Sequence, residues 1–182
     1  MSEADRELVE RARAGDSGAF EMLVRRHLRA AHAVAYSVLG ERSDAEDVCQ
    51  DAFIAALEQL DTVQPEKFVA WLLRIVRNRA ISVQRQQHVR RSMPLEWANG
   101  ARGRDDPAAD AERSALRERL EAALAPLPAK QREVLLLHDL EGWKHREIGD
   151  LLGMKEGTVR YTLFEARRAV RARLGAARHK ES

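Results

Sequence analysis

The stretch "GDLLGMKEGTVRYTLFEARRAVRARL", residues 149–174, joins the end of a short apolar helix to a long arginine-rich segment. Residues 145–152 have the spacing of a short amphipathic helix that ends at Gly153, and a second helix is expected to begin near Glu156. A helix, a short turn with glycine and a second helix are the plan of a helix-turn-helix motif. The sequence therefore predicts this motif in the last third of the chain.

The second helix of this motif separates an apolar face from a basic one. The residues expected to be buried recur at helical spacing: Val159, Leu163, Ala166, Val170 and Leu174. The other faces carry Arg160, Tyr161, Phe164, Arg167, Arg168 and Arg171. From residue 144 to residue 182 there are ten Lys or Arg against five Asp or Glu, a net charge of +5 where the whole chain has only +2.

Two interpretations of this basic helix are open. Arginine-rich helices are often simply solvated, and a helical hairpin with glycine in its turn is common. The aromatic pair Tyr161 and Phe164 favours DNA binding, because exposed aromatic side chains fit the base edges and thymine methyl groups of a major groove.

The composition describes a globular chain for a reducing compartment. With 182 residues, 45% of them hydrophobic, the chain can form one domain or two small ones. The single Cys49 has no partner for a disulfide or a thiolate metal cluster and is expected to be a small buried residue. No apolar run approaches the roughly 20 residues of a membrane span, and the first residues lack a signal-peptide core. We therefore expect a cytoplasmic protein without stable membrane insertion.

Helical periodicity continues through the rest of the chain, and no strand-like alternation competes with it. We predict an all-α protein made of two helical domains, residues 1–91 and 111–178. The segment 92–110 is rich in Pro, Gly, Asn and Asp and is expected to be a flexible linker whose Leu95 and Trp97 still dock elsewhere.

Several helix boundaries are also predicted. Asp5 is expected to cap a first helix, and a second begins near Asp16 and ends at Gly40. Ser43, followed by Glu46 three residues later, has the spacing of a capping box. The buried stripe expected for the second helix is Phe20, Leu23, Val24, Leu28, Ala31, Ala35, Val38 and Leu39.

The first domain carries two opposite charge runs. Residues 41–61 contain seven acidic side chains and only one basic one, Arg42. Residues 74–91 contain six arginines and no acidic side chain. Such a layout suits a module that holds a polyanion on one side and a basic protein surface on the other.

Three blocks carry a family resemblance. They are "DAEDVCQDAFIAAL" (44–57), "FVAWLLRIVRNRAIS" (68–82) and "LPAKQREVLLLHDLEGWKHREIGDLLGMKEGTVRYTLFEARRAVRARL" (127–174). In this order they resemble regions 2 and 4 of the extracytoplasmic-function (ECF) sigma factors of the sigma-70 family. The resemblance implies a dissociable subunit of bacterial RNA polymerase that recognises promoters and helps to open them. It also implies binding to the polymerase β′ clamp and β subunit, to promoter DNA and to an anti-sigma factor.

The resemblance further implies roles for individual residues. The core-polymerase surface would contain Asp47, Gln50 and Asp51. The minus-ten surface, which captures an unstacked base, would contain Arg74, Arg77, Asn78, Arg79, Ser82 and Arg85. The minus-thirty-five surface would contain Arg160, Tyr161, Phe164, Arg167 and Arg168. A basic helix beside a polar loop suits a strand that is being separated, because both backbone charge and splayed bases then need partners.

Four positions depart from the usual family pattern. Lys155 stands where a capping Ser is common, and Thr162 and Glu165 stand where Arg is frequent. Ser82 is smaller than the Asn or Asp often found there. Glu165 is expected to repel a nearby phosphate, so its replacement by Arg should strengthen promoter binding.

Two alternative interpretations belong to other classes of protein. A helix-turn-helix regulator with a helical N-terminal signalling or dimerisation domain would leave both charge runs unexplained. A metal-dependent nuclease would use Asp44, Glu46, Asp47 and Asp51, but no positioned histidine or base accompanies them. His138 and His145 are interpreted as surface or interface side chains and not as metal ligands. We therefore expect no enzymatic activity, cofactor or metal.

Overall fold

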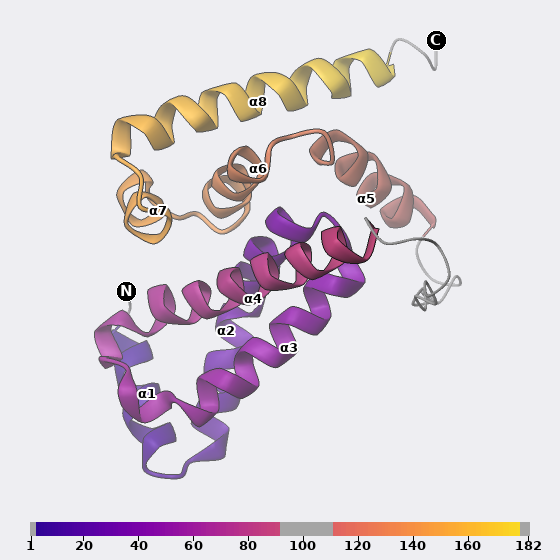
Figure 1. The fold of residues 1–182 in the computed structure, drawn as a ribbon. Coiled ribbons are helices and arrows are strands. Elements are labelled where there is room, and N and C mark those ends of the chain that lie inside the picture. The colour runs from indigo at the N-terminus through magenta and orange to yellow at the C-terminus, as the bar shows by residue number, and fades with distance from the viewer. Residues whose placement is uncertain (1–2, 92–110, 179–182) are drawn as a thin grey trace. The chain divides into compact units, whose positions relative to one another are not determined.

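The computed structural model describes residues 3–91 and 111–178, and in these ranges every regular element is helical (Figure 1). The described helices fall into two compact units, one with α1 to α4 and one with α5 to α8. The all-α prediction is confirmed. The predicted linker 92–110, with Leu95 and Trp97, lies outside the described residues.

The first unit is a four-helix bundle. Its elements are α1 (Glu3–Arg13), α2 (Ser17–Leu39), α3 (Arg42–Glu58), the 3-10 turns η1 (Leu60–Thr62) and η2 (Pro65–Lys67), and α4 (Phe68–Arg91). Helices α2, α3 and α4 pack against one another, and α1 packs against α2 (Figure 1). Their contacts bury Leu23, Val34, Phe68, Leu72 and Val76 completely. This core fixes the outward faces of α3 and α4, which carry the two charge runs.

Two of the predicted helix starts are wrong. Helix α1 begins before Asp5, a residue that is only 3% exposed and whose carboxylate accepts a hydrogen bond from Arg26 at 2.6 Å. Burial alone would raise the pKa of Asp5, but hydrogen bonds from Arg26 and His27 outweigh it and hold the pKa below its usual value. Asp5 therefore connects α1 to α2 and is not the N-cap of α1.

Helix α3 also begins earlier than the predicted capping box allows. Its first residue is Arg42 and its N-cap is Glu41, so Ser43 lies inside the first turn. Glu46 instead accepts a hydrogen bond from Arg42 one turn away, at 2.8 Å. By contrast, α2 starts as predicted: the Asp16 carboxylate accepts from the Ala19 N–H, and Gly40 ends the helix with φ 72°.

The buried side of α2 is broader than the predicted stripe, of which Ala31, Ala35 and Val38 are buried as expected. Leu28 is exposed, while His27, Ala30 and Val34 are buried with Leu23. The partners α1, α3 and α4 surround α2, so three-dimensional packing chooses which apolar residues are covered.

The second unit contains the helix-turn-helix. Its elements are α5 (Ala111–Leu124), α6 (Ala129–Leu135), the π-helical turn η4 (Leu136–Leu140), α7 (His145–Leu152) and α8 (Glu156–Arg178). Helix α8 packs against α5, α6 and α7 (Figure 1). On its predicted apolar face Val159, Leu163 and Ala166 are buried, whereas Val170 and Leu174 are half-buried. Among the described helices, none is long and apolar enough to cross a membrane.

Candidate nucleic-acid and polymerase interfaces

The turn between α7 and α8 depends on two glycines. Gly153 ends α7 in the left-handed region, with φ 66°. Inside α7, the Gly149 carbonyl accepts a hydrogen bond from the Met154 N–H at 2.9 Å. A Cβ at Gly149 would lie 2.6 Å from the Met154 carbonyl oxygen, so the returning backbone leaves room only for glycine. The sequence pattern identified Gly153 but missed Gly149.

Gly149→Ala should therefore destabilise the helix-turn-helix by about 2 kcal/mol, since backbone must move to accept one methyl group. The matched control is Gly157→Ala in the first turn of α8, where a Cβ meets nothing within 4 Å. That change should be neutral or stabilising by about 0.4–1 kcal/mol. Hydrogen exchange of the α7 and α8 amides measures both effects, and equal protection in the two variants would contradict the close contact.

Helix α8 presents an open basic and aromatic face. Tyr161 and Phe164 are 66% and 61% exposed. Arg160, Arg168 and Arg171 are exposed beside them, on the side opposite Val159, Leu163 and Ala166. The sequence predicted this face correctly.

Three arginines of the predicted minus-thirty-five set are held by carboxylates. Arg160 pairs with Glu156 at 2.5 Å and Arg168 pairs with Glu165 at 2.7 Å, both within α8. Arg167 pairs with Asp139 of η4, with its Nε at 3.0 Å from one carboxylate oxygen. Each pair lowers the positive charge that the face presents to an anion.

The sequence suggested that Glu165 carries an unpaired charge near the DNA, but in the structure its carboxylate is paired. The side chain is only 20% exposed, and its carboxylate is turned to Arg168. Lys155 serves as the residue before α8, where its carbonyl accepts from the Thr158 and Val159 amides at 2.9 and 3.1 Å. Thr162 is half-buried at the edge of the packed face.

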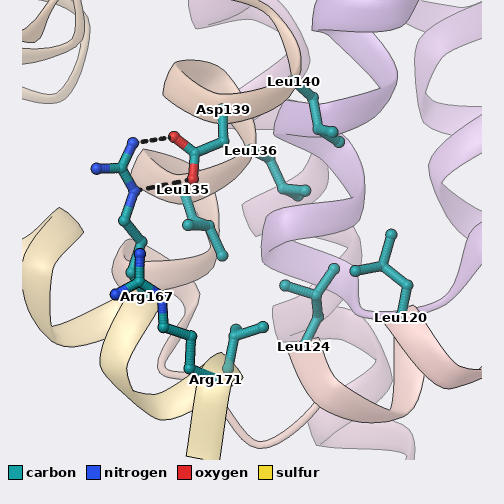
Figure 2. A pocket seen from close by; sticks show the side chains of 9 residues that line it. Leu120, Leu124, Leu135, Leu136, Asp139, Leu140, Arg167 and Arg171 are labelled. Atoms are coloured by element: carbon teal, nitrogen blue, oxygen red, sulfur yellow. Dashed lines mark hydrogen bonds and ion pairs between the residues drawn. The ribbon is translucent and has the colours of Figure 1, made fainter. Parts of the chain in front are cut away.

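An apolar pocket of about 250 Å³ opens within the second unit (Figure 2). Leucines of α5, α6 and η4 point into it, and the Asp139 and Arg167 pair lies at one side (Figure 2). Its lining residues are Leu120, Leu124, Leu135, Leu136, Asp139, Leu140, Arg167, Val170 and Arg171. The sequence did not predict this pocket. Two of its lining residues, Leu120 and Leu140, are large apolar side chains that remain exposed.

Helix α3 carries an acidic stripe that continues into an apolar one. Asp47, Gln50 and Asp51 are all exposed on the outer face of the helix. Ile54 and Leu57, 53% and 52% exposed, follow at helical spacing on the same face. Only the acidic residues of this face were predicted, although the same helical spacing in the sequence also indicates its apolar continuation.

Helix α4 presents most of the predicted minus-ten residues. Arg74, Asn78, Ser82 and Arg85 are exposed, whereas Arg77 and Arg79 are half-buried. The Ser82 hydroxyl donates to the Asn78 carbonyl at 3.0 Å. Arg79 Nη1 lies 3.8 Å from Asp51 Oδ2, so the structure brings together residues assigned to two different surfaces.

Glutamine side chains hold the second half of α4 against its neighbours. Gln84 donates to the Val38 carbonyl and Gln87 donates to the Asp44 carboxylate, both at 2.7 Å. These contacts position the basic helix relative to α2 and α3.

Two family models match the chain. The Sigma-70 region 2 model matches residues 23–90, and the Sigma-70, region 4 model matches residues 117–170. The ECF RNA polymerase sigma factor SigE of Mycolicibacterium smegmatis is 34% identical over 86% of this chain and 63% of its own length. The RNA polymerase sigma factor CnrH of Cupriavidus metallidurans is 33% identical over 96% of both chains. The chain belongs to the sigma-70 family, in its ECF group.

A solved structure supports the same assignment. CnrH in complex with the cytosolic domain of CnrY superposes with a TM-score of 0.70 at 31% identity, over 96% of this chain and 99% of that one. This sigma factor is thus an RNA polymerase-binding, promoter-specific factor of transcription initiation. The regulator alternative gave the N-terminal helices a signalling or dimerisation role, and the region 2 match replaces that interpretation.

Three of the four acidic residues of the nuclease alternative have separate partners in this sigma factor. Asp44 accepts from Gln87, Glu46 from Arg42, and Asp51 faces Arg79. Across residues 3–91 and 111–178, no three His, Cys, Asp or Glu side chains gather as metal ligands. Cys49 is buried as predicted, and burial raises the pKa of its thiol to about 12.

The two histidines lie together beside α8. The rings of His138 and His145 have centroids 4.7 Å apart, and His138 Nδ1 lies 2.9 Å from Asp139. Partial desolvation, with the nearby His138 as a further cause, lowers the pKa of His145. The hydrogen bonds from Arg167 hold the pKa of Asp139 below its usual value.

Proposed function

We propose that this sigma factor divides its work among three helices: α3 holds core polymerase, α4 supports promoter melting, and α8 reads the minus-thirty-five element. The observation that carries the proposal is the pairing of an acidic and apolar α3 surface with a basic α4 surface on one unit. A protein that bound only duplex DNA would need neither. The two predicted domains, 1–91 and 111–178, are the proposed functional modules.

The proposed clamp-binding surface is the α3 stripe of Asp47, Gln50, Asp51, Ile54 and Leu57. Charged residues at an interface steer association, while exposed apolar side chains supply area to bury. The stripe offers both on one helix face. The β′ clamp, expected from the family, is the proposed partner.

The proposed melting surface is the exposed side of α4 together with the half-buried Arg77 and Arg79. Its arginines neutralise backbone phosphates, and polar side chains such as Asn78 and Ser82 reach the edges of an unstacked base. Because Ser82 already donates to the Asn78 carbonyl, its oxygen remains available as an acceptor. The full proposed set is Arg74, Arg77, Asn78, Arg79, Ser82 and Arg85.

The proposed minus-thirty-five surface is the open face of α8, placed in the major groove. It contains Arg160, Tyr161, Phe164 and Arg168, and Arg167 joins them when it leaves Asp139. Phosphate contacts set the position of this helix, and base-edge contacts set its preference.

Regulation by an anti-sigma factor is also proposed. The related CnrH has been solved with the cytosolic domain of CnrY. The apolar pocket of the second unit is a surface that such a partner, or the polymerase β subunit, would cover. We further propose that the protein acts without catalysis of its own, in the cytoplasm where polymerase and chromosome are found.

Arg160→Ala should weaken binding of the holoenzyme to the minus-thirty-five duplex and relax preference at one or two base pairs by about 1–3 kcal/mol. The matched control is Arg173→Ala, which removes another exposed α8 arginine from outside the proposed surface. Binding to a library of minus-thirty-five duplexes measures both. A uniform loss across all sequences would mean that Arg160 touches phosphate and not a base.

Glu165→Gln should tighten duplex binding because it releases Arg168 toward the DNA backbone. The gain should be largely independent of sequence and should steepen the salt dependence by about 0.9 in the log–log slope for each phosphate newly neutralised. Glu165→Arg should act in the same direction for the same reason. Unchanged affinity and slope in both variants, measured in a salt series, would show that this edge of α8 faces away from DNA.

A further inference from the structure

The ion pair between Arg167 and Asp139 differs from the other two on α8. Arg160 and Arg168 pair with carboxylates of their own helix, three or four residues away. Arg167 reaches across to η4, where Asp139 is 28 residues earlier in the sequence. This pair therefore depends on how η4 packs against α8, and not on helical spacing alone.

The contact uses both sides of the guanidinium fork. Arg167 Nε donates to one oxygen of Asp139 at 3.0 Å, and Nη2 donates to the other at 2.5 Å (Figure 2). Such bidentate pairs are the strong class of arginine contacts, and their geometry suits a phosphate equally well. A phosphate of the DNA backbone and the Asp139 carboxylate thus compete for the same donors.

Neighbouring side chains stabilise the ionised form of Asp139, which binds Arg167. The hydrogen bonds from Arg167 lower the pKa of Asp139, and the pKa of Arg167 is raised in return. His138 adds a second contact, since its Nδ1 lies 2.9 Å from Asp139 and 3.4 Å from Arg167 Nη2. Both side chains of the pair remain partly exposed, so the pair can open without unfolding.

The position of Arg167 on α8 determines where its side chain can go when the ion pair with Asp139 opens. It is followed by Arg168 on the open face and preceded by buried Ala166, so it lies at the border between the two. A long side chain at this border can point to η4 or swing toward the open face. In the structure it points to η4.

We propose that Asp139 is a positioning residue that withholds Arg167 from promoter DNA and thereby limits the affinity of the minus-thirty-five contact. This inference rests on the proposed function of α8. When the carboxylate is removed, Arg167 becomes free to neutralise one more phosphate. The effect on binding should be independent of base sequence, because phosphate contacts position without specifying.

The test is a salt series of minus-thirty-five duplex binding by holoenzyme that contains the full chain. Asp139→Asn keeps the shape of the side chain and removes its charge. We expect binding to tighten on the order of five- to tenfold at 0.1 M salt, with a log–log slope steeper by about 0.9. The control Asp150→Asn removes an exposed carboxylate from α7 and should change the affinity much less.

A double-variant cycle separates the specific contact from a general charge effect. In the Arg167→Ala background, Asp139→Asn should give no more gain than Asp150→Asn, because no guanidinium remains to be released. A gain that persists without Arg167, an unchanged affinity, or a loss of affinity in Asp139→Asn would each overturn the inference. Circular dichroism melting of the variants checks that the helices remain folded.

Duplex binding by the wild-type holoenzyme distinguishes failure of the Asp139 inference from failure of the proposed function of α8. If wild-type holoenzyme binds the duplex and Arg160→Ala weakens it, the α8 assignment stands whatever Asp139 does. If neither Arg160→Ala nor Arg168→Ala affects duplex binding, the proposed role of α8 is wrong and the inference falls with it.

Discussion

Reversing the charges of Asp47 and Asp51 to Lys should lower the affinity of this sigma factor for core polymerase by about tenfold to a hundredfold. Both side chains are exposed on α3, beside the apolar Ile54 and Leu57. Opposite charges across an interface steer encounter and suppress wrong pairing, so reversal acts on association strongly. Stability should change little, because exposed charges on a helix face contribute little to folding. A binding titration with core enzyme measures the effect.

The matched control reverses two other exposed acids, Glu7 in α1 and Glu66 in η2. It changes the net charge equally but leaves α3 intact, and its affinity should stay close to that of the wild type. Ile54→Ser tests the apolar part of the same stripe and should also weaken binding. Core affinity that is the same in the Asp47 and Asp51 variant as in the control would remove α3 from the interface.

Replacing Arg77 and Arg79 by Ala should slow open-complex formation roughly tenfold or more, since two contacts to a separating strand are lost. Both arginines are half-buried on α4, and Arg79 also faces Asp51 at 3.8 Å. Permanganate reactivity of unpaired thymines follows the opening. Binding to the duplex flank of a pre-melted promoter bubble should be affected less, because melting has already occurred there.

The control for this variant is Arg6→Ala with Arg25→Ala. These arginines are exposed on α1 and α2, and each pairs with a glutamate four residues away. Open-complex formation should remain near the wild-type rate. An equal loss on intact and pre-melted templates would indicate a folding defect in α4 instead of a role in melting.

Local signals in the sequence predicted much of the fold. The cap at Asp16 and the stops at Gly40 and Gly153 lie where the structure has them, because each acts through its nearest backbone neighbours. Asp5 was misassigned as a cap because its real partners, Arg26 and His27, are about 21 residues away. No local pattern reports a partner at that distance.

In the candidate DNA-binding site, too, local spacing predicts some features, and others depend on three-dimensional packing. The exposed face of α8 follows from helical spacing, so the predicted exposure of Tyr161 and Phe164 is confirmed. The Arg167 and Asp139 pair depends on the packing of a π-helical turn, which periodicity does not specify. Gly149 was missed for a similar reason, since the close approach of the Met154 carbonyl exists only in three dimensions.

Run-off transcription tests most directly whether this chain confers promoter specificity on RNA polymerase. Core enzyme alone and core enzyme with the full chain are presented with promoter fragments selected from a randomised library. We predict discrete run-off products only when the chain is present, and their loss in the Asp47 and Asp51 reversal variant. A chain that binds duplex DNA by itself, yet adds no specific transcript to core enzyme, would contradict the account.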